Sequence, residues 1–392
     1  MRGERRTCRN RPESPIEEME AMPDPVSDVL VIGGGMAGTA IAAHLSAHAR
    51  VRLLEMEDQP GYHSTGRSAA LFSETYGNDA IRALSRASRR QFFSAPDDFA
   101  SIPLVRPRPV LVFARTGQEA AFEAFAAKEA AGVDVIGPDQ ALALCPVLRP
   151  EGLLGAAVDA GTADIEVHEL QQAYLRRFRE RGGLLSVGAK VTGISRVQEA
   201  WAVECGDRTY RADLIVNAAG AWAGELGRMA GAQDIGLEPR RRTAVLVEVA
   251  GGAHHDWPMI LDVEETFYAK PDAGLLLVSP ADETPSPPCD AQPDEIDIAV
   301  AIDRLQAAAT VDVRRVRSRW AGLRSFVKDR SPVVGFDTVQ PGFFWVAALG
   351  GYGIQTAPAL SRVAASLAMG LPVDAEIEDF GVHADEISPA RL

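Results

Sequence analysis

The sequence predicts an α/β protein in which a domain with a parallel sheet is interleaved with a second, α+β domain built on an antiparallel sheet. The chain has 392 residues, which is too long for one compact core. A short apolar run at 28–32, a glycine turn, an apolar helix and a second run at 51–54 form a βαβ pattern. Between about 236 and 320, strand-like runs surround a proline-rich loop and one helix, which is typical of an antiparallel sheet with helical cover.

The composition is that of a globular enzyme and excludes several other classes of protein. Hydrophobic residues make up 46% of the chain and charged residues 24%. The net charge of −14 repels phosphate backbones, so we expect no nucleic-acid partner. No apolar run is long enough to span a bilayer, and the four cysteines show no metal-binding spacing. We therefore expect no transmembrane segment, no bound metal and a reducing, cytoplasmic location.

The domain boundaries follow from where these patterns begin and end. Residues 1–26 are basic and then acidic, without an apolar core, and predict a disordered extension in place of a secretory signal. We expect the first domain to comprise residues 27–95, 161–235 and 321–392. The second domain is expected to comprise residues 96–160 and 236–320.

Hydrophobic periodicity places the individual elements in order along the chain. Short β-branched runs between turn residues predict strands at 28–32, 51–54, 110–115, 189–194, 200–205, 214–218, 244–249, 266–269, 275–278 and 343–348. Apolar residues that recur every three to four positions predict helices at 36–47, 79–93, 116–131, 167–181, 294–309 and 354–369. The helix at 167–181 has a defined end, because a glycine pair follows it.

The first strand-to-helix turn carries the pattern G-x-G-x-x-G. Gly33 permits the tight turn, Gly35 lets the backbone approach a pyrophosphate, and Gly38 lets the helix pack closely on the strand. The helix N-terminus then offers free N–H groups to the anion. Glu55, at the end of the second strand, is placed to accept hydrogen bonds from ribose hydroxyls. The motif predicts a Rossmann-like dinucleotide site and does not by itself distinguish FAD from NAD.

A polar, glycine-bearing loop at 61–78 carries a more specific signal. Its first part, GYHSTGRSAA, resembles the flavin-contacting loop of the D-amino-acid oxidase-like (DAO) FAD-dependent oxidoreductases. Further resemblance, in the same order, is carried by VNAAGAW, EPRRRTA, HDWPM, FYAKPDAG, WAGLRSF and FFWVAALGGYGIQT, so it extends from about residue 28 to 392. Within the family, the chain is most similar to the bacterial D-arginine dehydrogenases. The family implies a D-amino-acid oxidase/glycine oxidase-like fold.

The resemblance implies that FAD is the cofactor, and we expect it to be bound non-covalently. Arg67 in the loop either neutralises pyrophosphate charge or braces the loop. The turn GGYG at 350–353 is either a second anion cradle or a tight turn from the residues alone, and the resemblance places it beside the flavin. The expected contacts to FAD are Gly33, Gly35, Ala37, Gly38, Glu55, Met56, Ser64, Thr65, Gly66, Arg67, Ser68, Ala70, Leu71, Val191, Gly220, Trp222, Gly322, Gly350, Gly351, Tyr352, Gly353 and Ile354.

Arg324 stands in the apolar stretch WAGLRSF and therefore needs an anionic partner, either a ligand carboxylate or a structural ion pair. Arg240 and Arg241 are interpreted as part of a solvated charge run. The resemblance implies that Arg242, Tyr268 and Arg324 hold the substrate α-carboxylate.

The resemblance also suggests two groups near the rest of the substrate. It implies that Tyr76 lies on an active-site lid, and surface packing is an equal interpretation of this residue. It places Gln355 and the carbonyl of Gly351 near the substrate amine.

Two positions depart from the resembled D-arginine dehydrogenases. A glutamate that recognises the cationic side chain is replaced by Val110, and a histidine near the flavin loop is replaced by Leu71. A guanidinium beside these residues would lose a charge-assisted contact, so we expect an apolar or neutral substrate side chain. The expected side-chain pocket comprises Leu71, Val110, Met259 and Leu261.

These observations predict oxidative deamination of a D-amino acid, with hydride transfer from Cα to flavin N5 and hydrolysis of the imine to a 2-oxo acid and ammonia. Two alternatives remain: a glycine or sarcosine-type amine oxidase, and a non-catalytic FAD-binding subunit of a complex. Water or Tyr76 is the candidate proton acceptor. The sequence does not specify the electron acceptor, or whether the protein is a monomer or a dimer.

Overall fold

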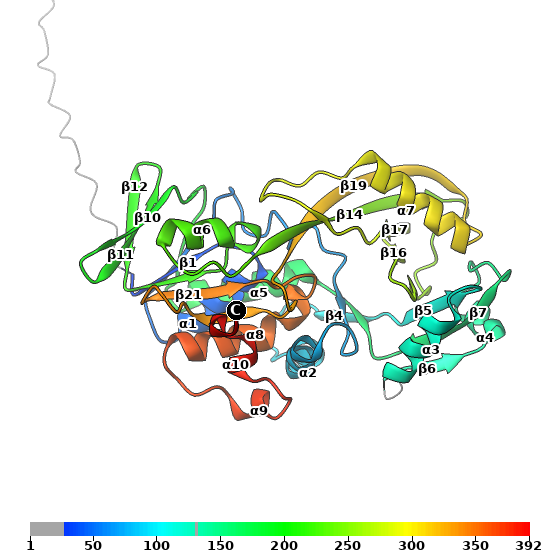
Figure 1. Ribbon diagram of the computed structural model, residues 1–392, viewed down its shortest axis with the longest axis horizontal. Helices are drawn as coiled ribbons and strands as arrows, with labels where there is room; N and C mark the ends of the chain where they lie inside the picture. The colour runs from blue at the N-terminus through cyan, green and yellow to red at the C-terminus, as the bar shows by residue number, and fades with distance from the viewer. Residues whose placement is uncertain (1–26, 130–131) are drawn as a thin grey trace, which may run out of the picture.

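A six-stranded sheet organises the first domain of the computed structural model, which describes residues 27–129 and 132–392 (Figure 1). The strand order is β20-β21-β13-β1-β2-β9, with β20 antiparallel to an otherwise parallel sheet. The expected extension at 1–26 lies outside the described residues. The strands are β1 (Val29–Ile32), β2 (Val51–Leu54), β9 (Leu184–Ser186), β13 (Leu214–Asn217), β20 (Val333–Phe336) and β21 (Phe343–Ala347).

Both faces of this sheet are buried, which explains its continuous apolar strands. Val29 and Val31 pack against α1 (Met36–Leu45), α5 (Val167–Glu180) and α8 (Gly353–Ala368). Leu30 and Ile32 face the other way. They pack against a three-stranded sheet and α6 (Ala223–Ala230). The small sheet consists of β10 (Gly193–Val197), β11 (Ala200–Cys205) and β12 (Arg208–Ala212).

A nine-stranded, mostly antiparallel sheet forms the second domain. Its order is β18-β14-β17-β16-β15-β5-β7-β6, with β19 paired to β14. The long strands β14 and β19 sweep across the upper right of Figure 1 beneath α7 (Glu295–Ala308). The strands are β5 (Val110–Arg115), β6 (Asp134–Ile136), β7 (Leu153–Asp159), β14 (Glu238–Val249), β15 (Met259–Asp262), β16 (Tyr268–Asp272), β17 (Leu275–Ser279), β18 (Thr284–Pro285) and β19 (Val313–Phe326).

The remaining elements connect and cover the two large sheets. A second small sheet has the order β3-β8-β4, and α2 packs against α8. No helix of the described residues has the length and apolar composition needed to cross a membrane. These elements are β3 (Leu71–Phe72), β4 (Val105–Pro107), β8 (Ala163–Ile165), α2 (Asp79–Phe93), α3 (Glu119–Lys128), α4 (Pro138–Leu144), α9 (Ala375–Glu378), α10 (Ala384–Ile387) and the 3₁₀ turns Gly220–Trp222 and Pro389–Arg391.

The two faces of the nine-stranded sheet differ in chemistry. Val245 and Ala269 point into an apolar core that includes α7. Because successive residues of a strand alternate between faces, Arg242 and Tyr268 point the opposite way. Arg242 is paired with Gly322, and Arg240 with Arg324, so Arg242 and Arg324 share this second face. The pairing of β14 with β19 therefore creates a cationic face from residues more than 80 positions apart in sequence.

The structure corrects three parts of the sequence analysis. The strand expected at 189–194 begins only at Gly193, because the preceding segment is irregular and lines a cavity. Strand β19 was missed: its first half, VRRVRSR, is mostly exposed and has no apolar periodicity. Since β19 continues to Phe326, a boundary at residue 320 would divide a strand, and we propose to place it after Phe326.

Candidate functional site

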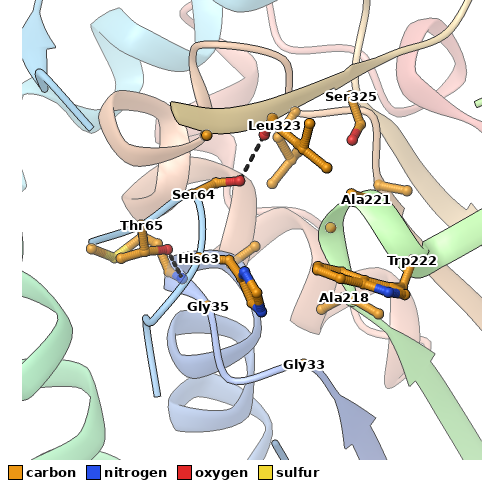
Figure 2. Close-up of a pocket in the computed structure, with 18 of the residues that line it drawn as sticks. Gly33, Gly35, His63, Ser64, Thr65, Ala218, Ala221, Trp222, Leu323 and Ser325 are labelled. Atoms are coloured by element: carbon orange, nitrogen blue, oxygen red, sulfur yellow. Dashed lines mark hydrogen bonds between the residues drawn. The ribbon is translucent and has the colours of Figure 1, made fainter. Parts of the chain in front are cut away.

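A cavity of about 310 Å³ lies where the carboxyl ends of the parallel strands meet the cationic face of the antiparallel sheet. Ile32, Leu54 and Ala218 border it from the first sheet, and Arg242 and Tyr268 border it from the second. The carboxyl edge of a parallel sheet is where nucleotide ligands bind in folds of this type. Figure 2 shows the glycine turn and the loop at 63–65 on one side of the cavity, with Trp222 opposite.

At Gly33 and Gly38, the first glycine turn accommodates no residue larger than glycine. This leaves room for a pyrophosphate beside the turn. A Cβ at Gly33, where φ is +107°, would lie 2.5 Å from the carbonyl oxygen of Ala218. A Cβ at Gly38 would lie 1.8 Å from the carbonyl oxygen of Gly33. Gly35 caps α1, and the first helical N–H, from Met36, donates to Thr65 Oγ1 at 2.9 Å. The tight turn predicted for Gly33 and the close helix packing predicted for Gly38 therefore agree with the geometry, and the role of Gly35 beside a pyrophosphate stays a prediction.

Glu55 stands at the nucleotide end of the cavity. Its Oε2 accepts a hydrogen bond from Gly34 N–H at 2.7 Å, and its Oε1 accepts one from Glu57 N–H at 2.9 Å. Burial raises the pKa of the Glu55 carboxyl, while these two amides oppose that rise. Each oxygen retains a lone pair for a ribose hydroxyl. Met56 and Val191 border the cavity beside it, as predicted.

The loop at 61–70 is fastened to strand β19. Ser64 Oγ donates to the carbonyl oxygen of Leu323 at 2.6 Å, as Figure 2 shows. Arg67 donates to the carbonyl oxygens of Ala291 and Ala321, each at 3.0 Å, and forms an ion pair with Asp290. Of the two roles considered for Arg67, the structure supports bracing the loop.

His63 was not predicted, although it borders the cavity. Its ring lies 4.7 Å from that of Trp222, and its Nε2 is 2.8 Å from Glu57 Oε1. Figure 2 shows both rings facing the same space. One signal in the sequence could have identified His63 as a cavity residue: it lies next to Ser64 in the loop that resembles a flavin-contacting loop.

Most of the residues expected to contact the cofactor border this one cavity. They are Gly33, Gly35, Ala37, Glu55, Met56, Ser64, Thr65, Arg67, Ser68, Val191, Gly220, Trp222, Gly322, Gly350, Gly351, Gly353 and Ile354. The residues Gly38, Gly66, Ala70, Leu71 and Tyr352 lie outside its lining. Gly66 closes the loop by donating its N–H to the carbonyl oxygen of Gly61 at 2.8 Å.

Arg324 differs from the other arginines of the cavity in its hydrogen bonding. Among the described residues, its guanidinium has no hydrogen-bond or ion-pair partner. Burial opposes its charge, yet the nearby phenols of Tyr268, Tyr76 and Tyr352 raise the pKa of Arg324 above its ordinary value. An arginine held in a cavity without a partner leaves all five N–H donors for a ligand, and its planar fork matches a carboxylate.

Arg242 and Tyr268 stand close to Arg324, and Arg242 is already engaged by two other residues. Arg242 Nε donates to the carbonyl oxygen of Asp282 at 2.7 Å, and Nη2 donates to Glu283 Oε1 at 3.2 Å. Burial and the charge of Arg324 lower the pKa of Arg242. Burial opposes ionisation of Tyr268, but the two guanidinium groups lower the pKa of its phenol below the ordinary value.

The second glycine turn makes room for Arg324. A Cβ at Gly351 would lie 2.8 Å from Nη1 of Arg324. At Gly350, φ is +52° and a Cβ would lie 2.4 Å from the ring of Phe326. The turn thus holds the guanidinium against bare backbone at the entrance to α8.

The structure gives Tyr76 and Gln355, the two residues expected near the rest of the substrate, different surroundings. Tyr76 lies outside the cavity lining; its ring packs at a tilt against that of Tyr352, with centroids 5.0 Å apart, and it lies near both arginines. Gln355 is buried outside the cavity lining: its Oε1 accepts from Ser73 N–H at 3.3 Å, and its Nε2 donates to Ser85 Oγ at 2.9 Å. We therefore do not assign Gln355 to a substrate amine.

Arg241 is not on a solvated face, contrary to the sequence analysis. It lies on the face of β14 opposite to Arg242, and its Nη2 donates to Asp297 Oδ2 of α7 at 2.7 Å. Arg240 is partly exposed and pairs with Glu238 at 3.1 Å. The alternation of β14 separates three consecutive arginines into different environments.

The four residues expected to form the side-chain pocket lie together in an apolar cluster. Val110 is buried there, and Leu71, Met259 and Leu261 are partly buried against it. All four lie outside the lining of the cavity. By contrast, His254, His255 and Asp256 are exposed on the loop between β14 and β15, as expected for a surface segment.

Comparisons with known proteins agree with this geometry. The model of the FAD dependent oxidoreductase (DAO) family matches residues 28–367. FAD-dependent oxidoreductase domain-containing protein 1 of Bos taurus is 23% identical over 418 residues, covering 91% of this chain and 84% of that protein. Glycine oxidase of Bacillus licheniformis is 24% identical over 376 residues, covering 92% and 98%.

The solved structures show the same fold. The crystal structure of L-proline dehydrogenase from P. horikoshii has a TM-score of 0.79 at 20% identity and covers 94% of this chain and 98% of that one. These comparisons support the family-level resemblance, and they do not establish the narrower similarity to D-arginine dehydrogenases.

Proposed function

This chain belongs to the FAD-dependent oxidoreductase (DAO) family and uses FAD, and from that premise we propose that it oxidises an α-amino acid at the Cα–N bond. The preferred substrates we propose are D-amino acids with an apolar or neutral side chain. The observation that carries the proposal is the guanidinium of Arg324, which has no partner among residues 27–129 and 132–392 and lines the cavity that the glycine turn and cofactor loop also border.

The residues of the cavity fit FAD. The turn at Gly33 and Gly38 has no space for a side chain, and α1 presents its N-terminus beside it. Glu55 is suited to the ribose, and the loop at 61–70 lies between this end and Arg324. Of the described cysteines, none lines the cavity, which is consistent with non-covalent binding.

In the proposed mechanism, Arg324 binds the substrate carboxylate through two parallel N–H···O bonds, and the phenol of Tyr268 donates a third. Arg242 contributes positive charge. These contacts would orient Cα–H toward the flavin site, and the chemistry that bound FAD would supply there is uptake of a hydride. The amine loses a proton to water or to Tyr76. Water then hydrolyses the imine to a 2-oxo acid and ammonia.

The substrate preference rests on the resemblance: where the resembled D-arginine dehydrogenases carry a glutamate and a histidine, this chain has Val110 and Leu71, which belong to an apolar cluster outside the cavity lining. The members of this cluster offer no acceptor to a guanidinium or ammonium group. We expect a higher kcat/KM for D-leucine, D-methionine or D-phenylalanine than for D-arginine or D-lysine. The reverse order would contradict the proposed preference.

A glycine or sarcosine-type oxidation is the second candidate. It is favoured by the similarity to glycine oxidase, which extends over 98% of that protein. Adding glycine and sarcosine to the same anaerobic panel separates the two. Bleaching of the flavin by an amino acid in the purified chain also argues against a non-catalytic subunit.

The direct test is Arg324→Met. Because the variant removes the free guanidinium, we expect KM to rise by roughly 100-fold, equivalent to the loss of a charge-assisted hydrogen-bonded contact, while FAD content is retained. Arg319→Met on the same strand is the control, because Arg319 is exposed and pairs with Glu295 outside the cavity. Normal kinetics in Arg324→Met would remove this residue from the site.

A further inference from the structure

The two arginines of the carboxylate site are not equivalent. Arg242 uses Nε and Nη2, one whole edge of its guanidinium, on Asp282 and Glu283. Arg324 uses no edge on any described residue. Arg324 can therefore bind a ligand carboxylate through two hydrogen bonds. Arg242 acts on the same carboxylate mainly as a fixed positive charge.

The charge of Arg242 is in turn offset by Glu283. The Glu283 carboxylate lies 3.2 Å from Nη2 of Arg242, 2.8 Å from Nη2 of Arg330 and 3.9 Å from Nη1 of Arg240. Partial burial opposes its ionisation, but Arg330, Arg242 and Arg240 hold the pKa of Glu283 below its ordinary value. Glu283 is therefore an anion throughout the neutral range.

The position of Glu283 matters because it lies just outside the cavity. Arg242 and Arg324 line the cavity, whereas Glu283 does not. It acts on a ligand through the largely buried Arg242 and through its own field, which water screens only in part because the Glu283 side chain is partly buried. Without Glu283, the positive charges of both Arg242 and Arg324 would face the substrate. The site would then suit a substrate with two carboxylates.

We propose that Glu283 is a specificity-determining residue that restricts the site to substrates with one carboxylate. This inference rests on the proposed oxidation of α-amino acids. By offsetting part of the charge of Arg242, Glu283 leaves Arg324 as the main cation that neutralises the α-carboxylate. A second carboxylate on the side chain then meets repulsion from Glu283 without a free cation to balance it.

The test compares D-aspartate with its neutral isostere D-asparagine in Glu283→Gln. Glutamine keeps an acceptor for Arg242 and Arg330 and removes the charge. We expect the ratio of kcat/KM for D-aspartate over D-asparagine to rise on the order of tenfold. Glu238→Gln is the matched control, since Glu238 pairs with Arg240 and not with Arg242, and its ratio should stay within about twofold of the wild type.

Arg330→Met supplies an independent variant. It removes a cation that offsets Glu283, so the same ratio should fall. If Glu283→Gln does not retain FAD, the ratio measured for Arg330→Met tests the role of Glu283 in its place. An unchanged ratio in a flavin-loaded Glu283→Gln enzyme, or an equal loss for both substrates, would overturn the proposal, because a purely structural role affects both alike.

A binding measurement separates this inference from the proposed function. Benzoate and phthalate are titrated into the FAD-loaded proteins, and binding is followed by the change in flavin absorbance. We expect Glu283→Gln to improve the affinity for phthalate relative to benzoate on the order of tenfold. If no amino acid is oxidised but this shift occurs, the proposed reaction is wrong and the role of Glu283 holds. If oxidation occurs without either shift, the role of Glu283 is wrong.

Discussion

At the scale of single residues, the site depends on Gly351, which has no side chain, beside the charged side chain of Arg324. Gly351 lets the guanidinium of Arg324 lie against the backbone, where a Cβ would come within 2.8 Å of Nη1. We expect Gly351→Ala to displace the guanidinium and to raise KM by roughly tenfold with unchanged FAD content. Gly137→Ala is the control, since its Cβ meets no atom within 4 Å. Equal KM values in the two variants would contradict this account.

Tyr268 makes carboxylate binding depend on pH. Below its pKa the phenol is neutral and donates a hydrogen bond; above it, the phenolate repels a carboxylate. Since Arg324 and Arg242 lower this pKa despite burial, benzoate affinity should fall as pH rises, beginning below the ordinary pKa of tyrosine. Tyr268→Phe should bind benzoate more weakly at neutral pH and lose this dependence. A wild-type-like pH profile of binding in the variant would disprove the assignment.

At the scale of elements, the N-terminus of α2 connects stability with the site. The Asn78 side chain accepts a hydrogen bond from Ile81 N–H at 3.1 Å and donates one to Ser331 Oγ at 2.9 Å. Tyr76 lies two residues earlier, beside Tyr352. Asn78→Ala should destabilise the fold by about 1–2 kcal/mol and also raise KM.

Asp294→Ala is the matched control for this prediction. Asp294 is itself exposed and caps α7 by accepting a hydrogen bond from Ile296 N–H at 2.9 Å, far along the chain from Tyr76. Thermal unfolding should show a loss of about 1 kcal/mol, and the kinetics should remain those of the wild type. If both variants change KM equally, the connection between α2 and the site is wrong.

At the scale of the whole molecule, the cavity joins two domains that share no sheet. Its walls come from both the parallel and the antiparallel sheets, so a bound cofactor stabilises the arrangement of the two. FAD that binds only the folded state adds about 2.7 kcal/mol to stability at 100 times its Kd. Removing FAD should therefore lower Tm, and added FAD should restore it in a concentration-dependent way. Identical Tm values with and without FAD would contradict this.

The sequence by itself determined the local parts of this protein. The tight packing at Gly33 and Gly38 and the apolar strands follow from short-range sterics and periodicity, and the structure confirms them. The roles of Gly35 and Glu55 toward the cofactor stay predictions. The resemblance over residues 28–392 correctly indicated FAD and the family. These features were predictable because each depends on residues close together in the chain.

Only the tertiary structure decided which side chains are free to bind a ligand. Arg67 and Arg324 both stand beside small residues, yet Arg67 is bound to carbonyl oxygens from another segment and Arg324 has no partner among the described residues. Gln355 is hydrogen-bonded to Ser73 and Ser85, and Arg242 to Asp282 and Glu283 in the segment between β17 and β18. The reason is physical: hydrogen-bond partners here lie tens to hundreds of positions away, and only the register of β14 with β19 and the packing of the two domains determine them.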